Sequence, residues 1–178
     1  MDVYKGKISK EILGLFTSGT GSDEFFSYVG NLVSVEQALA VFGILSPDFI
    51  EHENHVFWRA KASADATSGL RLVGLMVTET GQLQPSSQRI DVERYQNNFS
   101  VSQFFSKWED TSENSVSRVG LTDKDYQLCH VFAQQLVRYW KIALFECFPH
   151  RTFEFEVADD LLDEYGVCLT FWQPENSV

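Results

Sequence analysis

Hydrophobic residues recur at helical spacing through the segment from Leu121 to Phe148, which Pro149 ends. They follow one another at intervals of three and four residues, which places side chains on one face of an α-helix. These positions are Cys129, Ala133, Leu136, Trp140, Ala143 and Cys147. Thr122 and Asp125 can cap the start of the segment. The pattern therefore predicts a long amphipathic helix that covers a hydrophobic core.

The N-terminal part of the chain is also expected to be helical. Ser34 and Gln37 form a capping box, and apolar residues at helical spacing follow until Pro47 breaks the pattern. Another helix is expected to begin near Phe25. The residues before it include a Gly- and Ser-rich linker, so we expect residues 1–21 to be loosely attached.

The middle of the chain predicts two short helices and a loop. Residues 90–97 and 101–108 have helical spacing, and Ser100 and Gln103 can cap the second of these segments. The polar residues 110–120 show no periodicity. We expect them to form a mobile surface loop.

Four segments are rich in β-branched and aromatic residues and predict strands. They are residues 55–60, 70–77, 152–158 and 166–172. In the last two, apolar and polar residues alternate, which is typical of a strand with one face toward a core. Together these elements predict a single α+β domain over residues 1–178, in which a small, mainly antiparallel sheet packs against the long helix.

The composition is that of a folded, acidic domain. The chain has 178 residues, of which 44% are hydrophobic and 15 are Phe, so a sizeable aromatic core is expected. A net charge of −11 argues against nucleic acid or an anionic membrane as the partner, because both require clustered Lys and Arg. The sequence has no signal peptide and no apolar run of about 18 residues, which predicts a cytoplasmic protein.

Acidic residues concentrate in the C-terminal part of the chain. From Glu146 onward there are eight acidic residues and one basic residue, a net charge of −7. Six of them lie in or between the last two predicted strands, namely Glu154, Glu156, Asp159, Asp160, Asp163 and Glu164. No catalytic motif accompanies them. We therefore interpret this region as a docking face for a basic protein partner, in an accessory or immunity-like module.

A small-molecule-binding protein or an enzyme with an aromatic pocket is the alternative function. His52, His55, Trp58 and Trp172 are the candidate pocket residues. Two histidines three positions apart point to opposite faces of a strand, so they could share a metal ion only if the segment turns. We predict no metal site, no cofactor and no catalytic residue, and an enzyme is the less favoured interpretation.

The three cysteines match no metal-binding or redox spacing. Cys129 and Cys147 would lie about 27 Å apart on the long helix, too far for a disulfide bond. We expect Cys129, Cys147 and Cys168 to be free thiols in a reducing compartment.

Several stretches of core and turn residues follow a recognisable order. They are VEQALAVFGILSPDFIEHENHVFW, ERYQNNFSVSQFF, CFPHRTFEFEV and VCLTFWQ. In this order they resemble a family of small uncharacterised bacterial α+β proteins over residues 35–172. The family has His where this chain has Asn98 and Ser100. The resemblance implies a fold and brings no activity, cofactor or partner with it.

Overall fold

The computed structural model describes residues 8, 10–16, 25–58, 73–105, 107–112 and 115–175. Its longest element is helix α4 (Asp123–Cys147). The backbone N–H of Asp125 donates to Thr122 Oγ1 at 3.2 Å, and the Asp125 carboxylate accepts from the Thr122 backbone N–H at 3.3 Å. This capping box satisfies two donors that the first helical turn would otherwise leave unpaired, as the sequence predicts.

One face of α4 is buried, as the spacing predicts. The buried residues are Cys129, Ala133, Leu136, Trp140, Ala143 and Leu144. Cys147, which we expected on the same face, is exposed at the last residue of the helix, and Leu144 is the final residue that reaches the core. The Trp140 ring lies 5.3 Å from that of Trp58 and 5.5 Å from that of Phe99. Aromatic rings from distant parts of the chain thus form much of the core.

The central sheet has three antiparallel strands in the order β5–β9–β8. They are β5 (Phe99–Ser100), β9 (Glu164–Trp172) and β8 (Glu154–Leu161). Val167, Leu169 and Phe171 of β9 are fully buried in the cluster that includes the apolar face of α4. Because alternate residues face opposite sides of a strand, Thr170 and Trp172 lie on the other face.

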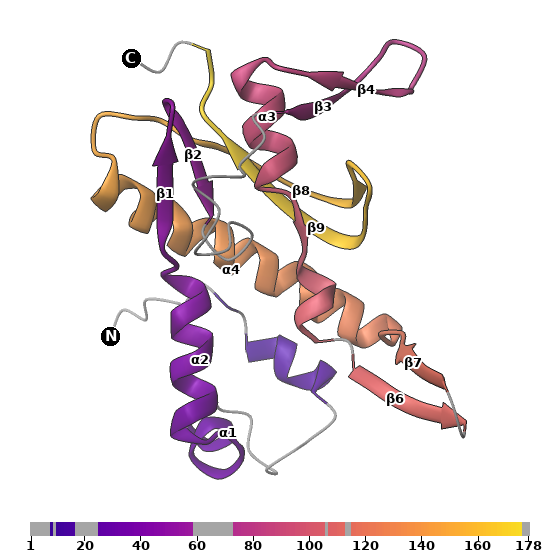
Figure 1. Ribbon diagram of the computed structural model, residues 1–178. Helices are drawn as coiled ribbons and strands as arrows, with labels where there is room; N and C mark the ends of the chain where they lie inside the picture. The colour runs from indigo at the N-terminus through magenta and orange to yellow at the C-terminus, as the bar shows by residue number, and fades with distance from the viewer. Residues whose placement is uncertain are drawn as a thin grey trace.

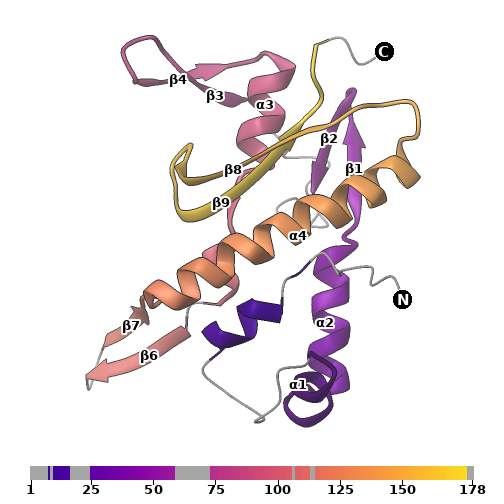
Figure 2. The same ribbon diagram turned by 180° about the vertical axis from the view of Figure 1, so that it is seen from behind.

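Helix α3 (Arg89–Gln96) packs on that second face of the sheet. The Thr170 hydroxyl donates to the backbone carbonyl of Arg94 at 2.6 Å. The sheet therefore lies between two helices, with α3 and α4 on opposite sides (Figure 1; Figure 2 shows the reverse view). The chain is an α+β protein with its long helix against antiparallel strands, as predicted.

The remaining described strands form antiparallel hairpins. β1 (Phe49–His52) pairs with β2 (His55–Trp58), β3 (Gly74–Val77) with β4 (Leu83–Ser86), and β6 (Lys107–Ser112) with β7 (Ser115–Val119). β3 lies so close to α3 that a Cβ atom at Gly74 would be 2.3 Å from the carbonyl carbon of Asp91. Only glycine fits at this position without moving the helix.

The N-terminal elements are a 3₁₀ helix and two short α-helices. They are η1 (Lys10–Leu15), α1 (Phe25–Leu32) and α2 (Val35–Leu45). The predicted capping box is present, because Gln37 N–H donates to Ser34 Oγ at 3.1 Å and Ser34 N–H donates to Gln37 Oε1 at 2.9 Å. The end of α2 is held to α4, since Trp140 Nε1 donates to the carbonyl of Ile44 at 2.8 Å.

Two buried polar side chains, from α3 and from the residue that ends it, join the β1–β2 hairpin to the central sheet. Glu93 Oε1 accepts from the backbone N–H of Val56 at 2.8 Å, and its Oε2 accepts from the backbone N–H of Gln173 at 2.6 Å. Oε1 also accepts from the Gln173 side-chain amide at 2.6 Å. One carboxylate therefore binds backbone donors from both β2 and the chain just after β9.

Asn97, four residues after Glu93, makes the same connection with its amide. Its Oδ1 accepts from the N–H of Trp58 at 3.0 Å. Its Nδ2 donates to the carbonyl of Val56 at 2.9 Å and to that of Phe171 at 3.1 Å. We call Glu93 and Asn97 the polar clamp. Both residues are fully buried, and burial raises the pKa of Glu93 above its usual 4.5.

The structure corrects several details of the predicted elements. Residues 55–58 and 74–77 are strands, but neither is hydrogen-bonded by its backbone to the sheet formed by β8 and β9. The first is connected through the polar clamp, and the second packs on α3. The predicted strand residues 59–60 and 70–72, and most of residues 1–21, lie outside the described residues.

The helix expected over residues 101–108 is wrong. Only a short 3₁₀ helix, η3 (Val101–Phe104), is present, and β6 begins at Lys107. Ser100 does not cap it with its side chain, because Ser100 belongs to β5 and pairs with Cys168. The loop expected over residues 110–120 is instead largely the β6–β7 hairpin. Its mostly polar sequence shows no alternation of apolar and polar residues that would indicate a strand.

The polar clamp should contribute strongly to stability. Asn97→Ala removes the partners of two buried carbonyls and one buried N–H, so we expect the free energy of unfolding to fall by about 3 kcal/mol or more. Gln96→Ala is the matched control on the same helix, because Gln96 loses one exposed hydrogen bond, to the carbonyl of Val73. It should change stability by about 0.5 kcal/mol at most. Urea unfolding of the two variants measures the difference, and equal effects would contradict the assigned role.

Candidate functional site

The hairpin of β8 and β9 gathers four carboxylates around one tight turn. Leu161 pairs with Glu164, and the two residues between them, Leu162 and Asp163, have φ angles of 46° and 66°. Positive φ at both central positions is the geometry of a two-residue hairpin turn. We define the acidic tip as Asp159, Asp160, Asp163 and Glu164. The sequence predicted strands over residues 152–158 and 166–172, with residues 159–165 as the connection, whereas the observed strands extend almost to the turn.

Hydrogen bonds hold three of the tip carboxylates in place. Asp159 accepts from the Tyr126 hydroxyl at 3.1 Å, and its Oδ1 lies 3.0 Å from His130 Nε2 on α4. Asp160 Oδ1 accepts from the backbone N–H of Gly166 at 2.8 Å. Gln103 Nε2 donates to Glu164 at 3.1 Å. Asp163 is exposed at the turn itself.

The other two predicted acidic residues lie toward the far end of β8. Glu154 pairs across the sheet with Trp172 and is exposed. Arg94 of α3 forms a salt bridge with Glu156, in which its Nε and Nη2 both donate to Oε2 of the carboxylate. The Arg94 guanidinium also lies 5.2 Å from the centre of the Trp172 ring. The six acidic residues are therefore distributed along the whole hairpin, and Glu156 is already neutralised within the protein.

The negative charge of the acidic tip acts on Tyr126. Burial, together with the hydrogen bond to Asp159 and repulsion from Asp159 and Asp160, raises the pKa of Tyr126 to about 12. A phenol next to these carboxylates resists ionisation because its anion would be repelled. Tyr126 is thus a reporter of the electrostatic potential at the tip.

A polar cavity of about 170 Å³ lies beside the turn. Its lining residues are Tyr95, Gln96, Asn98, Leu162, Asp163 and Glu164. Asn98 is almost fully buried, and its Nδ2 donates to the carbonyls of Leu161 and Leu162. The cavity therefore has a fixed wall from the end of α3 and an acidic rim from the turn.

The four residues of the predicted aromatic pocket do not form one site. His52 and His55 face each other across the β1–β2 turn, because Glu53 and Asn54 reverse the chain with φ angles of 48° and 65°. Trp58 lies at the opposite end of that hairpin, where its ring is 4.5 Å from Phe99 in the core. Trp172 lies on the α3 side of the sheet, under Arg94.

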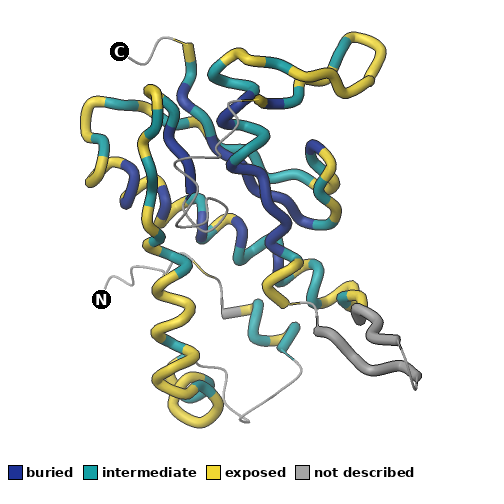
Figure 3. Tube along the Cα trace, in the orientation of Figure 1, coloured by how far each residue is buried: buried dark blue, intermediate teal, exposed yellow. Residues whose placement is uncertain are grey.

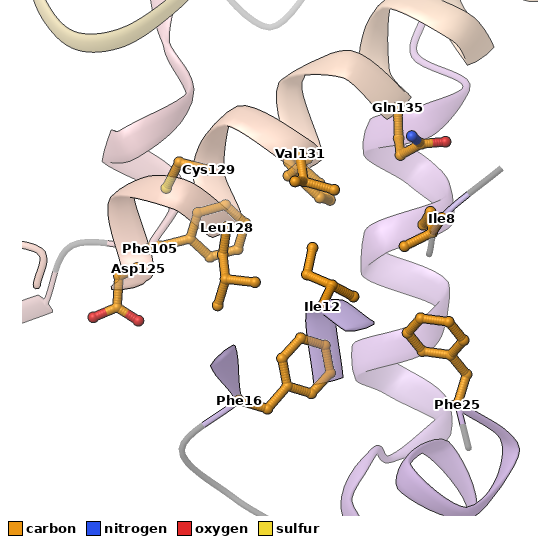
Figure 4. A pocket seen from close by; sticks show the side chains of 11 residues that line it. Ile8, Ile12, Phe16, Phe25, Phe105, Asp125, Leu128, Cys129, Val131 and Gln135 are labelled. Atoms are coloured by element: carbon orange, nitrogen blue, oxygen red, sulfur yellow. The ribbon is translucent and has the colours of Figure 1, made fainter. Parts of the chain in front are cut away.

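A different, apolar cavity of about 300 Å³ lies between the N-terminal elements and α4 (Figure 4). Ile12, Phe16 and Phe25 line one side, and Leu128 and Phe132 of α4 line the other. The cavity was missed from the sequence because its walls come from segments more than a hundred residues apart. The signal that could have indicated it is the width of the apolar stripe on α4, which exceeds what one sheet face covers.

The cysteines and the metal-binding residue types add no further centre. Burial raises the pKa of the Cys129 and Cys168 thiols, which keeps them protonated and unreactive. Within the described ranges, no three His, Cys, Asp or Glu side chains are grouped so that they could hold a metal ion. No helix in these ranges combines the length and apolar character that a membrane span requires.

The fold and these surfaces define an α+β protein with an acidic hairpin tip. Comparisons with family models, with curated proteins and with solved structures find no match to this chain.

Replacing Asp159 should lower the pKa of Tyr126. Asp159→Asn removes the negative charge and weakens the acceptor, so the pKa should fall below 12 but stay above 10, because burial of the phenol remains. A spectroscopic titration of tyrosine ionisation, with Tyr126→Phe to identify the signal, measures the shift. An unchanged titration curve would mean that the tip exerts no field on Tyr126.

Proposed function

We propose that this chain is a protein-binding module that receives a basic side chain of a partner protein at its acidic tip. The observation that carries the proposal is the polar cavity next to the turn, whose rim includes Asp163 and Glu164. An Arg or Lys side chain is long enough to enter such a cavity and can donate to carboxylates there. The surrounding charge favours a cation over any anionic ligand.

The charge distribution supports an electrostatic approach of the partner. The protein carries a net charge of −11, and the segment from Glu146 to the end accounts for −7 of it. A field of one sign accelerates the association of an oppositely charged partner and is screened by salt. A basic partner would therefore be steered to the C-terminal hairpin before any close contact forms.

The acidic tip is also held in a fixed conformation. Leu162 of the turn is 7% exposed, and Val167, which pairs with Asp159, is fully buried. Asn98 binds the turn carbonyls, and Asp160 binds the N–H of Gly166. Because the site needs little ordering on binding, little conformational entropy is lost. This rigidity suits an accessory or immunity-like protein of the cytoplasm that binds one basic target.

Reversing charge at the tip should weaken binding of the partner. We expect Asp159→Lys together with Asp163→Lys to weaken capture of the basic partner from a native lysate by about tenfold or more, because attraction becomes repulsion. The control is Glu146→Lys together with Glu175→Lys, which makes the same change in net charge at exposed positions away from the tip. Quantitative mass spectrometry at low and high salt gives the readout. Equal retention by both variants would overturn the proposal.

The apolar cavity favours a second candidate function, the binding of a small apolar molecule. An apolar cavity of about 150 Å³ is large enough to hold benzene, so 300 Å³ accommodates a larger neutral ligand. This interpretation retains the alternative of an aromatic pocket but moves it to residues of η1, α1 and α4.

A neutral fluorescent apolar probe tests this second candidate. Nile red should bind the unmodified protein and bind at least about tenfold more weakly to Leu128→Trp, because the larger side chain fills the cavity. Tyr165→Trp is the control, since Tyr165 is 78% exposed and lies on β9, away from the cavity. The same affinity in both variants would place the probe elsewhere.

A further inference from the structure

Helices α1 and α2 expose apolar side chains that nothing in the described structure covers. Neither helix contains a buried residue. Val35, Leu39 and Phe42 of α2 are 76%, 63% and 65% exposed, and Phe26 of α1 is 88% exposed. Figure 3 shows α2 exposed along nearly its whole length, on the side of the molecule away from the sheet. Apolar surface of this extent on a soluble domain marks an interaction site.

An isolated helix of this kind is not stable by itself. α2 has 11 residues, and helices shorter than about 12 residues are marginal in water unless tertiary packing stabilises an apolar face. The capping box and the hydrogen bond from Trp140 to Ile44 fix only its two ends. Ile44 and Leu45 at the end of α2 pack against the core, whereas no other described residue covers the face formed by Val35 and Leu39.

The near absence of charge between Phe25 and Pro47 indicates what kind of surface packs on α2. Between Phe25 and Pro47 the only charged residue is Glu36, whereas the whole chain carries −11. A basic partner gains nothing from this neutral face and would be drawn to the acidic tip. Two copies of an acidic protein repel each other elsewhere, but they can approach through a neutral apolar face.

We propose that α2 packs against α2 of a second copy of this chain, in an antiparallel pair around a twofold axis near Leu39. Val35, Leu39 and Phe42 follow at intervals of four and three residues, the spacing of a seam between two helices. In an antiparallel pair, Leu39 meets Leu39 of the second copy, and Val35 meets Phe42. The stripe is complementary to itself, as a twofold interface requires.

The available surface suits a dimer of modest size. α1 and α2 comprise 8 and 11 residues, fewer than the roughly 20–30 residues that each partner contributes to a standard interface, so a weak dimer that dissociates on dilution is expected. The surface continues onto α4, because Phe42, Leu45 and Tyr139 line one cavity of about 460 Å³. The interface is separate from the acidic tip and does not depend on the function proposed for it.

Light scattering coupled to size-exclusion chromatography tests the dimer on the purified full-length chain. We expect a mass of twice 20.3 kDa at high concentration, falling toward 20.3 kDa on dilution. Leu39→Glu should be monomeric at every concentration, because it places two like charges together at the axis. Ala40→Glu introduces the same charge at an exposed position on another face of α2 and should remain dimeric.

Circular dichroism of the unmodified chain provides a second readout, because a signal that depends on concentration does not rely on any variant folding correctly. Dilution of the unmodified chain should reduce the helical signal slightly as α2 loses its cover, whereas Leu39→Glu should show the lower signal at all concentrations. A single-copy mass for the unmodified chain at every concentration overturns the proposal, whether the face then binds another protein or a lipid surface. A dimer that persists in Leu39→Glu overturns the assigned interface.

Discussion

The polar clamp of Glu93 and Asn97 is the interaction on which the rest of the fold depends. The β1–β2 hairpin and the central sheet share no backbone pairing, and the side chains of α3 supply the missing hydrogen bonds. The clamp places Trp58 where its ring reaches Trp140 of α4. It also fixes the end of α3, from which Asn98 reaches the turn of the acidic tip. Core packing and candidate site thus have a common support.

The sequence predicted those helices and strands whose pattern of apolar and polar residues lies within one segment of the chain. The apolar stripe and the caps of α4 were evident because a helix repeats its core-facing positions every three or four residues. The alternation of apolar and polar residues in β8 and β9 predicted these two segments as strands. The acidic tip was partly predictable too, since Asp159, Asp160, Asp163 and Glu164 are neighbours in the sequence and a hairpin keeps them together.

Long-range and polar interactions could not be predicted in this way. Glu93 and Asn97 look like solvent-facing residues of a short helix, because their partners lie 37 to 80 residues away. The wall of the polar cavity was missed for the same reason, as Tyr95 and Asn98 meet Asp163 only in the folded chain. The polar strands β6 and β7 have no apolar alternation to indicate them. For the polar clamp and the cavity wall, the deciding contact is non-local and polar, whereas for β6 and β7 it is local pairing that the sequence pattern does not indicate.

The polar clamp also binds backbone groups at strand edges, where β-strands of other molecules could otherwise pair. The outer edge of β2 and the last residues of β9 present N–H and C=O groups that another strand could bind, and exposed edges of this kind are templates for intermolecular β-pairing. Glu93 and Asn97 occupy these groups at Val56, Trp58, Phe171 and Gln173. Glu93 and Asn97 thereby close two strand edges that no other described strand covers, and a further strand cannot extend the sheet from a side chain.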